Sequence, residues 1–278
     1  MKEYALFLGC TVPVRAQAYE KSVRAVASRL GIVLTDIPEL SCCGYPISSV
    51  WEQKGLALAA RNLALSETAG FGQMVCLCSA CSLHLKESAE RLNHDSQLLE
   101  ETNQQLARVG LAYRGTVSVF HIVDVLLSLD FHVKRDLSHL HVACHHGCHY
   151  FNPSRFIRIM ELPLHRLVER TGARLVEYPM ELECCGGGSM AVDERIPAAL
   201  ARAKLQDVYE HAADLLTVIC PFCYIVYGAS QKKLGLPFSV PVYFYPQLLG
   251  LAMGIDASEL GLSPAQAKTL LSQGGMLA

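Results

Sequence analysis

Hydrophobic and polar positions follow one series of patterns that occurs twice along the chain. Residues 18–30 and 156–170 carry apolar side chains at three- and four-residue spacing, which predicts two amphipathic helices. A short β-rich run follows each helix and ends at a proline, over residues 31–38 and 172–179. The repeated order indicates that one structural unit has been duplicated.

The similarity between the halves continues beyond these runs. Alanine-rich segments with an Ala-Arg step come next, and we expect them to be helical (Ala60-Arg61 and Ala201-Arg202). Further apolar strands are then expected at 74–77, 215–219, 117–120 and 240–243. Strands that alternate with helices favour parallel sheets. The sequence therefore predicts an α/β fold with two pseudo-symmetric halves, each a parallel sheet of βαβ units.

The duplication also suggests where the halves begin and end. We expect a first half, a second half and a short C-terminal tail, at 1–133, 139–254 and 255–278, with a linker near 132–140. Residues 82–114 form a polar insertion of helical character, in which His94-Asp95-Ser96 predicts a turn and a helix N-cap. Ser263-Pro264 predicts the start of a last helix.

Composition narrows the possible partners. Of the 278 residues 51% are hydrophobic and the mean hydropathy is +0.25, which is high for a protein outside the membrane. No apolar run reaches the roughly eighteen residues that a membrane span requires, so we expect the surplus apolar surface to contact partner subunits. The net charge of −2 gives no electrostatic basis for binding nucleic acid.

The N-terminus loosely resembles a signal peptide, because Lys2 precedes a short apolar stretch and small residues follow. Glu3 within the would-be basic region opposes that interpretation, as does the repetition of Gly9-Cys10 at Gly147-Cys148 deep in the chain. We therefore expect a cytoplasmic protein. In that reducing compartment twelve cysteines indicate metal ligands rather than disulfides.

Ten of the twelve cysteines form one pattern that occurs twice: a lone cysteine, an adjacent pair, and a Cys-x-x-Cys. The gap from the pair to the Cys-x-x-Cys is 34 residues in both halves. The members are Cys10, Cys42, Cys43, Cys78 and Cys81 in the first half, and Cys148, Cys184, Cys185, Cys220 and Cys223 in the second. The duplication predicts two equivalent metal or redox centres.

Five thiols in each half exceed the four ligands of a structural zinc. Adjacent cysteines have Cα atoms about 3.8 Å apart and side chains that tend to diverge, which suits two neighbouring irons better than two corners of one zinc. A zinc scaffold built on the two Cys-x-x-Cys motifs remains an alternative, but it leaves the adjacent pairs unexplained. The usual ferredoxin run of cysteines is absent.

This arrangement resembles the cysteine-rich CCG motif, whose glycine corresponds to Gly44 and Gly186, and the whole chain resembles the B-type subunit of heterodisulfide reductase. The resemblance implies two noncubane [4Fe-4S] clusters, each held by the five cysteines of one half, which face each other and cleave a disulfide. Cys144 is an alternative to Cys148 as a ligand, although Gly147-Cys148 repeats Gly9-Cys10. The resemblance also implies two partners in a heterodisulfide reductase-like complex, namely a ferredoxin-like iron–sulfur subunit (C-type) and a flavin-bearing subunit (A-type).

Other residues near the cysteines offer candidate roles. Of His145, His146 and His149, we favour His149 as a catalytic proton donor, while a hydrogen bond to backbone or cluster sulfur is the alternative for each. Arg15 and Arg155 follow the lone cysteines and are candidates for binding an anionic part of a substrate, with an ion pair to the fold or to a partner as the alternative.

The sequence thus predicts an oxidoreductase that acts on a sulfur group, reducing or oxidising a thiol–disulfide couple between two clusters. The alternative is a component of a respiratory or sulfur-oxidising complex that relays electrons without disulfide chemistry of its own. No flavin or nicotinamide fingerprint is present, so the electrons are expected to pass to or from a partner.

Overall fold

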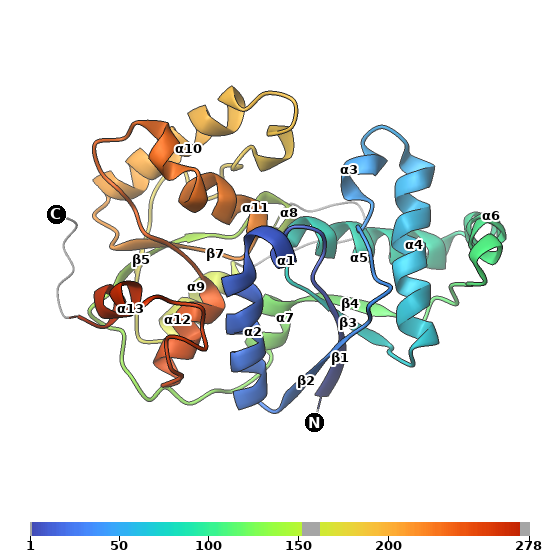
Figure 1. Cartoon of the computed structure of the whole chain (residues 1–278), viewed down its shortest axis with the longest axis horizontal. Helices are drawn as coiled ribbons and strands as arrows, with labels where there is room; N and C mark the ends of the chain where they lie inside the picture. The colour runs from blue at the N-terminus through green and yellow to red at the C-terminus, as the bar shows by residue number, and fades with distance from the viewer. Residues whose placement is uncertain (1, 152–161, 273–278) are drawn as a thin grey trace.

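Two four-stranded sheets organise the chain, and all of their strands run parallel (Figure 1). The computed structural model describes residues 2–151 and 162–272. The first sheet contains β1 (Lys2–Phe7), β2 (Ile32–Asp36), β3 (Gln73–Cys76) and β4 (Ser118–His121). The second contains β5 (His141–His145), β6 (Arg174–Val176), β7 (Leu215–Val218) and β8 (Val242–Phe244).

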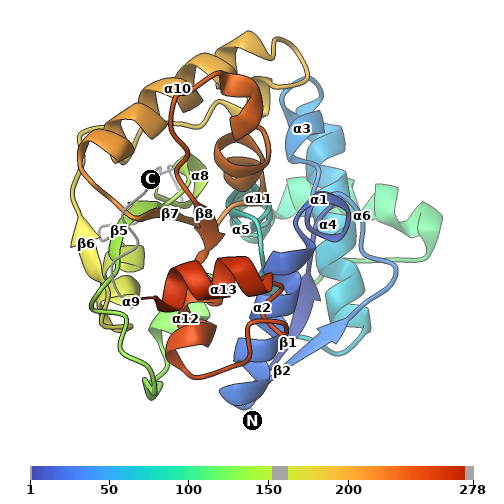
Figure 2. The ribbon, with the colours of Figure 1, turned by 60° about the vertical axis from the view of Figure 1, so that its left-hand side comes forward.

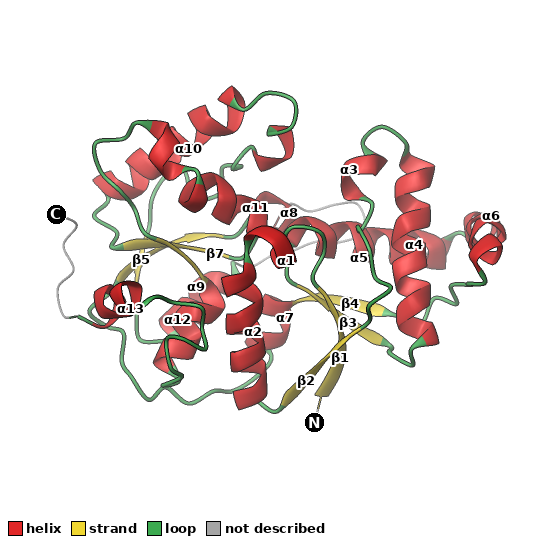
Figure 3. Ribbon diagram, viewed as in Figure 1, coloured by secondary structure: helices red, strands yellow, loops and turns green. Residues whose placement is uncertain are grey.

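Helices connect the strands and cover both faces of each sheet (Figure 3). The first half contains α1 (Val12–Arg15), α2 (Gln17–Arg29), α3 (Tyr45–Ser48), α4 (Glu52–Thr68), α5 (Ser79–His94), α6 (Ser96–Leu106), the 3₁₀ turn η1 (Ala107–Val109) and α7 (Ile122–Leu127). The second contains α8 (Cys148–Phe151), α9 (Pro163–Glu169), η2 (Gly187–Ser189), α10 (Arg195–Glu210), α11 (Pro221–Tyr224), the π-helical turn η3 (Ile225–Ala229), η4 (Gln231–Leu234), α12 (Tyr245–Ala252) and α13 (Pro264–Leu271).

The two sheets have the same topology. Their strand orders are β2-β1-β3-β4 and β6-β5-β7-β8, so each connection of one half has a counterpart in the other. The register agrees as well, because Phe7 pairs with Cys76 in the first sheet and His145 pairs with Val218 in the second. Phe7 and His145 each stand three residues before the lone cysteine of their half. Cys76 and Val218 each stand two residues before the first cysteine of the Cys-x-x-Cys. The predicted α/β fold with two similar halves is therefore confirmed.

Helices on the facing sides of the two sheets join the halves. Helix α2 packs against α12 (Figure 2), and α7 packs against α9. By position in the two halves α2 corresponds to α9, and α7 corresponds to α12. Such reciprocal contacts are those of a two-fold interface, here formed within one chain.

Tyr19 of α2 is a deeply buried link across this interface. Its hydroxyl donates a hydrogen bond to the carbonyl of Ile219, 3.0 Å away, and its ring stacks on Phe244 with centroids 4.1 Å apart. A phenol that is fully buried needs such a partner. Because Ile219 directly precedes Cys220, the interface also fixes one of the cysteine loops.

Several local predictions are confirmed. Asp95 caps α6 by accepting a hydrogen bond from the Leu98 amide at 2.9 Å, and Ser263 caps α13 in the same way. Residues 132–140, where the linker is predicted, contain no helix or strand. Of the helix predicted over 156–170, the part up to 161 lies outside the described residues, and α9 occupies 163–169. No helix in the described part of the chain is long and apolar enough to cross a membrane.

Candidate metal centre

The cysteines collect at the carboxyl ends of the central strands of each sheet. Chain order reverses between β1 and β3 and, in the second sheet, between β5 and β7. Parallel α/β sheets bind their ligands at such a switch point, in the crevice beyond the strand ends. Cys10 follows β1 and Cys78 follows β3, while Cys148 follows β5 and Cys220 follows β7.

Each Cys-x-x-Cys wraps around the start of a helix. Cys78 and Cys220 are the N-cap residues of α5 and α11, with extended backbone, and Cys81 and Cys223 lie in the first turns of those helices. The first backbone N–H groups of a helix are free and carry partial positive charge, which favours thiolates at this position. The motif therefore offers two preorganised sulfur ligands in each half.

A glycine makes the turn after each adjacent pair possible. Gly44 and Gly186 have φ of +96° and +71°, in the left-handed region that glycine adopts without strain. The turn brings the Gly44 amide to 3.5 Å from Cys42 Sγ and the Gly186 amide to 3.3 Å from Cys184 Sγ. These N–H groups donate to the cysteine sulfurs, so the loop is shaped to stabilise thiolates.

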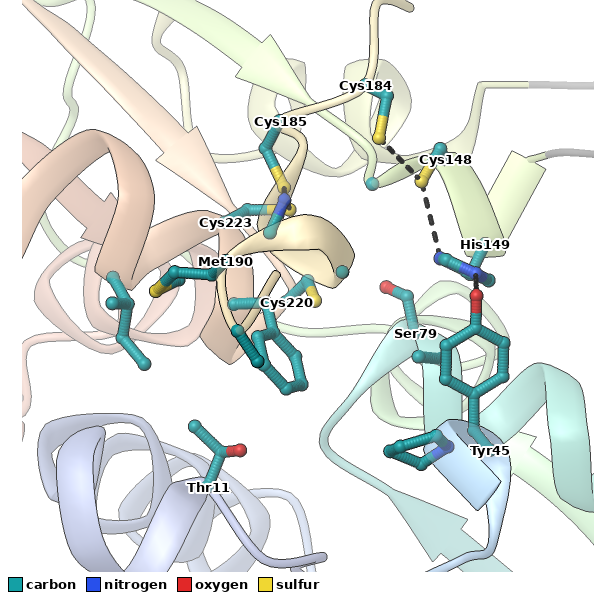
Figure 4. A pocket seen from close by; sticks show the side chains of 18 of the residues that line it. Thr11, Tyr45, Ser79, Cys148, His149, Cys184, Cys185, Met190, Cys220 and Cys223 are labelled. Atoms are coloured by element: carbon teal, nitrogen blue, oxygen red, sulfur yellow. Dashed lines mark hydrogen bonds between the residues drawn. The ribbon is translucent and has the colours of Figure 1, made fainter. Parts of the chain in front are cut away.

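The five thiols of the second half form a connected series (Figure 4). Cys148 Sγ lies 3.5 Å from Cys184 Sγ, and Cys223 Sγ lies 3.4 Å from Cys185 Sγ. Cys184 with Cys185, and Cys220 with Cys223, are close enough to shift each other's pKa, which completes the series. One compact site thus gathers all five sulfurs.

The first half has a corresponding arrangement. The thiols of Cys42 and Cys43, of Cys43 and Cys81, and of Cys81 and Cys78 are close enough for each to shift the pKa of the other. Cys10 interacts electrostatically with Cys42 and is the exposed end of the set. The two halves therefore present the same five positions in the same order.

The two thiol sets meet at one point. The thiols of Cys78 in the first half and Cys220 in the second are close enough for each to shift the pKa of the other. All ten thiols are consequently linked into one series that crosses from one half to the other. Two groups bound by these thiols would be neighbours.

Crowding makes this series hard to ionise without a cation. A hydrogen bond from Cys148 lowers the pKa of Cys184 to about 2, and the adjacent thiol of Cys42 lowers the pKa of Cys43 to about 3. The same two interactions raise the pKa of Cys148 and of Cys42. Without a bound cation, therefore, only some of these thiols can become thiolates. Five ligands that must all be deprotonated call for a bound positive centre, and the donor set fits an iron–sulfur cluster.

A cavity of about 850 Å³ opens between the halves beside the thiols. Its wall includes cysteines of both halves and a rim of apolar side chains, among them Val14, Val50 and Val192. Ser79 also lines it, and the Ser79 hydroxyl is buried with no hydrogen-bond partner among the described residues. An unpaired hydroxyl beside the sulfurs is suited to donate to a bound group.

The predicted proton donor His149 also lines this cavity and joins the two halves. His149 Nδ1 lies 3.3 Å from Cys148 Sγ, and Nε2 lies 2.5 Å from the hydroxyl of Tyr45 (Figure 4). When Cys148 is a thiolate, Nδ1 must donate, so Nε2 of a neutral ring accepts from Tyr45. Sequence reasoning assigned no role to Tyr45, although it directly follows Cys43-Gly44.

A second hydrogen-bonded histidine approaches the cysteines of the second half. Lys204 Nζ, which is fully buried, donates to His145 Nδ1 at 2.9 Å and to the carbonyls of Glu181 and Glu183 at 3.0 and 2.6 Å. An ammonium has three protons and accepts none, so Nδ1 is the acceptor and His145 Nε2 carries the proton. Nε2 then donates to Cys223 Sγ, 3.1 Å away.

Burial lowers the pKa of His145 well below the ordinary histidine value, so its imidazole is neutral. Burial also lowers the pKa of Lys204, to about 8, which leaves the ammonium charged at neutral pH. Sequence reasoning missed Lys204. Its signal was its place on the buried stripe of α10, between Ala201 and Val208, where an apolar residue is expected.

Cys144 belongs to a different cluster of side chains. It is buried in β5, and its sulfur lies within 4.8 Å of the side-chain ligand atoms of His165 and Glu181. Glu181 accepts hydrogen bonds from His146, at 3.0 Å, and from His165. The structure therefore brings Cys148, rather than Cys144, to the other cysteines of its half.

The remaining predicted residues are placed as follows. Arg15 is exposed and lines the cavity. Arg155 lies outside the described residues. Cys76 is buried at the end of β3, and burial raises the pKa of its thiol. His84 stands edge-on to Tyr45 and is 3.4 Å from the carbonyl of Gly55.

Comparison with known proteins connects this site to a family. Residues 4–86 and 142–226 each match the CCG cysteine-rich domain. The B-type subunit of ferredoxin:CoB-CoM heterodisulfide reductase from Methanosarcina mazei is 34% identical, over 94% of this chain and 93% of its own length. The chain belongs to the heterodisulfide reductase B-type family of tandem CCG proteins. The predicted family is confirmed.

Family relatives act in more than one kind of complex. The membrane anchor subunit of 8-methylmenaquinol:fumarate reductase from Wolinella succinogenes is 31% identical over 94% of this chain and 96% of its own length. These names describe subunits of oxidoreductase complexes, and the cysteine-rich domains support an iron–sulfur subunit of such a complex.

A solved structure supports the fold alone. The structure of a hypothetical protein from Helicobacter pylori matches with a TM-score of 0.81 at 17% identity, covering 94% of this chain and 51% of that chain. The tandem arrangement of two parallel sheets is therefore shared well beyond recognisable sequence similarity.

Proposed function

We propose that this protein is the catalytic iron–sulfur subunit of a heterodisulfide reductase-like complex. Two noncubane [4Fe-4S] clusters would be held by the five cysteines of each half, and a disulfide would be cleaved or formed between them. The observation that carries the proposal is the single series of ten thiols, which joins the halves at Cys78 and Cys220 beside one cavity.

The reaction consumes two electrons and two protons for each disulfide: RSSR′ + 2 e⁻ + 2 H⁺ gives RSH and R′SH. When bound, the clusters supply one-electron transfer and iron sites that can take up sulfur. The electrons would come from partner subunits, for which we propose a ferredoxin-like iron–sulfur protein and a flavin-bearing protein of the same complex. The reverse reaction would release the same electrons and protons.

The protein's own residues supply the protons. We propose His149 as the proton donor, because it lines the cavity and stands between Cys148 and the Tyr45 hydroxyl. Histidine exchanges protons near neutral pH, and a hydroxyl behind it can replace the proton it gives up. Tyr45 would therefore both hold the imidazole in one tautomer and return a proton to it.

Arg15 is proposed to bind an anionic part of the substrate, because it is exposed at the wall of the cavity that the cysteines also line. A guanidinium pairs well with a carboxylate, sulfonate or phosphate, and one such charged hydrogen bond changes affinity about tenfold or more. Arg155 is proposed for the same role from its place in the sequence after Cys148.

The test is reduction of a disulfide by the anaerobically purified protein with a chemical electron donor, followed as thiol released. Substitution His149→Gln is expected to lower kcat by about 100-fold or more, because it removes a positioned proton donor. Substitution Arg15→Gln is expected to raise KM about tenfold for an anionic disulfide and to leave kcat unchanged. Arg29→Gln, at the far end of α2, is the matched control and should change neither constant.

A pure electron relay is the second candidate. The similarity to the Wolinella succinogenes subunit favours it, because that protein's name refers to a fumarate reductase and not to a disulfide. A protein that contains iron and accepts electrons, yet releases no thiol from any disulfide offered, would support the relay and contradict the catalytic proposal.

A further inference from the structure

The duplication allows the two cluster sites to be compared position by position within one molecule. The Cys-Cys pairs and Cys-x-x-Cys motifs are spaced identically, so residues that follow the pairs correspond by simple counting. Lys204 and Asn62 each stand nineteen residues after the second cysteine of a pair. His145 and Phe7 each stand three residues before a lone cysteine and end the corresponding strands, β5 and β1.

Lys204 and Asn62 each hold the backbone next to a Cys-Cys pair by hydrogen bonds. Asn62 accepts a hydrogen bond from the Ser41 amide at 2.9 Å and donates to the carbonyl of Cys42 at 3.0 Å. Lys204 donates to the carbonyl of Glu183, which precedes Cys184 as Ser41 precedes Cys42. Both side chains are fully buried and hold the backbone that leads into the adjacent pair. One of them is neutral and the other carries a charge.

The two halves also differ in the hydrogen bonding of a cysteine sulfur, that of Cys223 in the second half. His145 donates a hydrogen bond to Cys223 Sγ at 3.1 Å and is held by Lys204 at 2.9 Å. Phe7, the corresponding residue of the first half, is fully buried and has no proton to donate. In the second half the Lys204 ammonium is therefore connected through the His145 imidazole to Cys223 Sγ. The first half has the Asn62 amide and the Phe7 ring at the corresponding positions.

We infer that this asymmetry separates the two clusters in reduction potential, with the second-half cluster the more easily reduced. The inference rests on the proposed function, since it assumes a cluster in each half. Reduction adds negative charge to a cluster and its sulfurs, and a hydrogen-bond donor or a nearby cation stabilises that charge. Low dielectric around buried Lys204 strengthens the effect.

The consequence is an ordered distribution of electrons. The first electron to arrive would reside in the half that contains Cys223, and the second in the half that contains Cys81. A substrate sulfur facing each cluster would then meet two electronically different iron sites. His145 and Lys204 are positioning residues in this scheme, because neither needs to touch the substrate.

Anaerobic spectroelectrochemical titration of the iron–sulfur absorption tests the inference. The unaltered protein should show two separate one-electron transitions. His145→Phe and Lys204→Asn install the first-half residues, and each should move the higher transition downward. The expected shift is at least a tenfold change in the ratio of reduced to oxidised cluster, which is about 59 mV for one electron.

Three comparisons sharpen the test. Lys233→Asn removes the same charge at an exposed site and should leave both transitions in place. His145→Gln keeps an N–H donor and should retain more of the original potential than His145→Phe does. Cys42→Ala together with Cys43→Ala should abolish the lower transition, which assigns the higher one to the second half.

The outcomes separate this inference from the proposed function. Full iron content with coincident transitions, or variants with full iron and unshifted potentials, would overturn the inference and leave the proposed function standing. If Lys204→Asn does not fold, Lys204→Met provides the same removal of charge with a side chain of similar length. A protein without iron would overturn both.

Discussion

Asn62 is the buried residue whose removal tests most clearly how the loop before the first Cys-Cys pair is held. Its side chain is fully buried in α4 and joins Ser41 N, Cys42 O and Leu58 O by hydrogen bonds of 2.9 to 3.0 Å. In Asn62→Ala the Leu58 carbonyl keeps its helical partner, but Ser41 N and Cys42 O lose theirs. Both groups are only part-buried, so leaving each of them unsatisfied destabilises by about 1–2 kcal/mol and the total is about 2–4 kcal/mol.

For a chain of this size about 1 kcal/mol corresponds to a Tm change of roughly 2–4 °C, so Asn62→Ala should melt roughly 5–15 °C lower. Circular dichroism under anaerobic conditions measures the Tm. The first-half cluster should also be lost, because the Cys42 loop is no longer held. Asn93→Ala is the control, since Asn93 is exposed and its hydrogen bond to the carbonyl of Gly115 is 3.4 Å long. Equal Tm values for the two variants would refute this account of the loop.

Three further predictions follow from the geometry. Gly186→Ala places a Cβ 2.8 Å from Leu200 at positive φ, and it should reduce iron content by displacing the second cysteine pair, measured as iron per chain. Burial alone would raise the pKa of Glu181, but hydrogen bonds from His146 and His165 lower it to about 2. The ionised carboxylate therefore stabilises the fold above its ordinary pKa of 4.5, and this stabilisation disappears as the pH falls toward 2. Glu181→Gln should flatten the curve of Tm against pH in that range, and an unchanged curve would contradict the assignment. Tyr19→Phe removes the hydrogen bond to Ile219 and should lower the free energy of unfolding by about 1–2 kcal/mol in urea titrations, with no effect if the two halves unfold independently.

The fold could be predicted because the duplicated spacing left few alternatives. Apolar runs that alternate with helical periodicity specify parallel sheets, and two copies of the same order specify two of them. Capping residues such as Asp95 and Ser263 act locally, so their roles follow from a few neighbouring residues. The duplicated cysteine spacing predicted two equivalent centres, and the family resemblance implied that five cysteines gather at each.

The contacts between the halves could not be predicted in this way. The relay from Tyr45 to His149 joins residues 104 positions apart, and the proximity of Cys78 and Cys220 depends on how two separate sheets pack. Lys204 escaped notice because a lysine on a helix is normally solvated, and only the buried stripe of α10 marks it as unusual. Chemistry that depends on tertiary packing leaves only weak signals in local sequence.

Iron and acid-labile sulfide per chain, measured on protein purified without oxygen, test the central claim most directly. Two four-iron clusters predict about eight irons and a matching amount of sulfide in the unaltered protein. Substitution of Cys43 or Cys185 by serine should each remove about half of that iron. Zinc without iron, or iron that depends on only one half, would contradict the account.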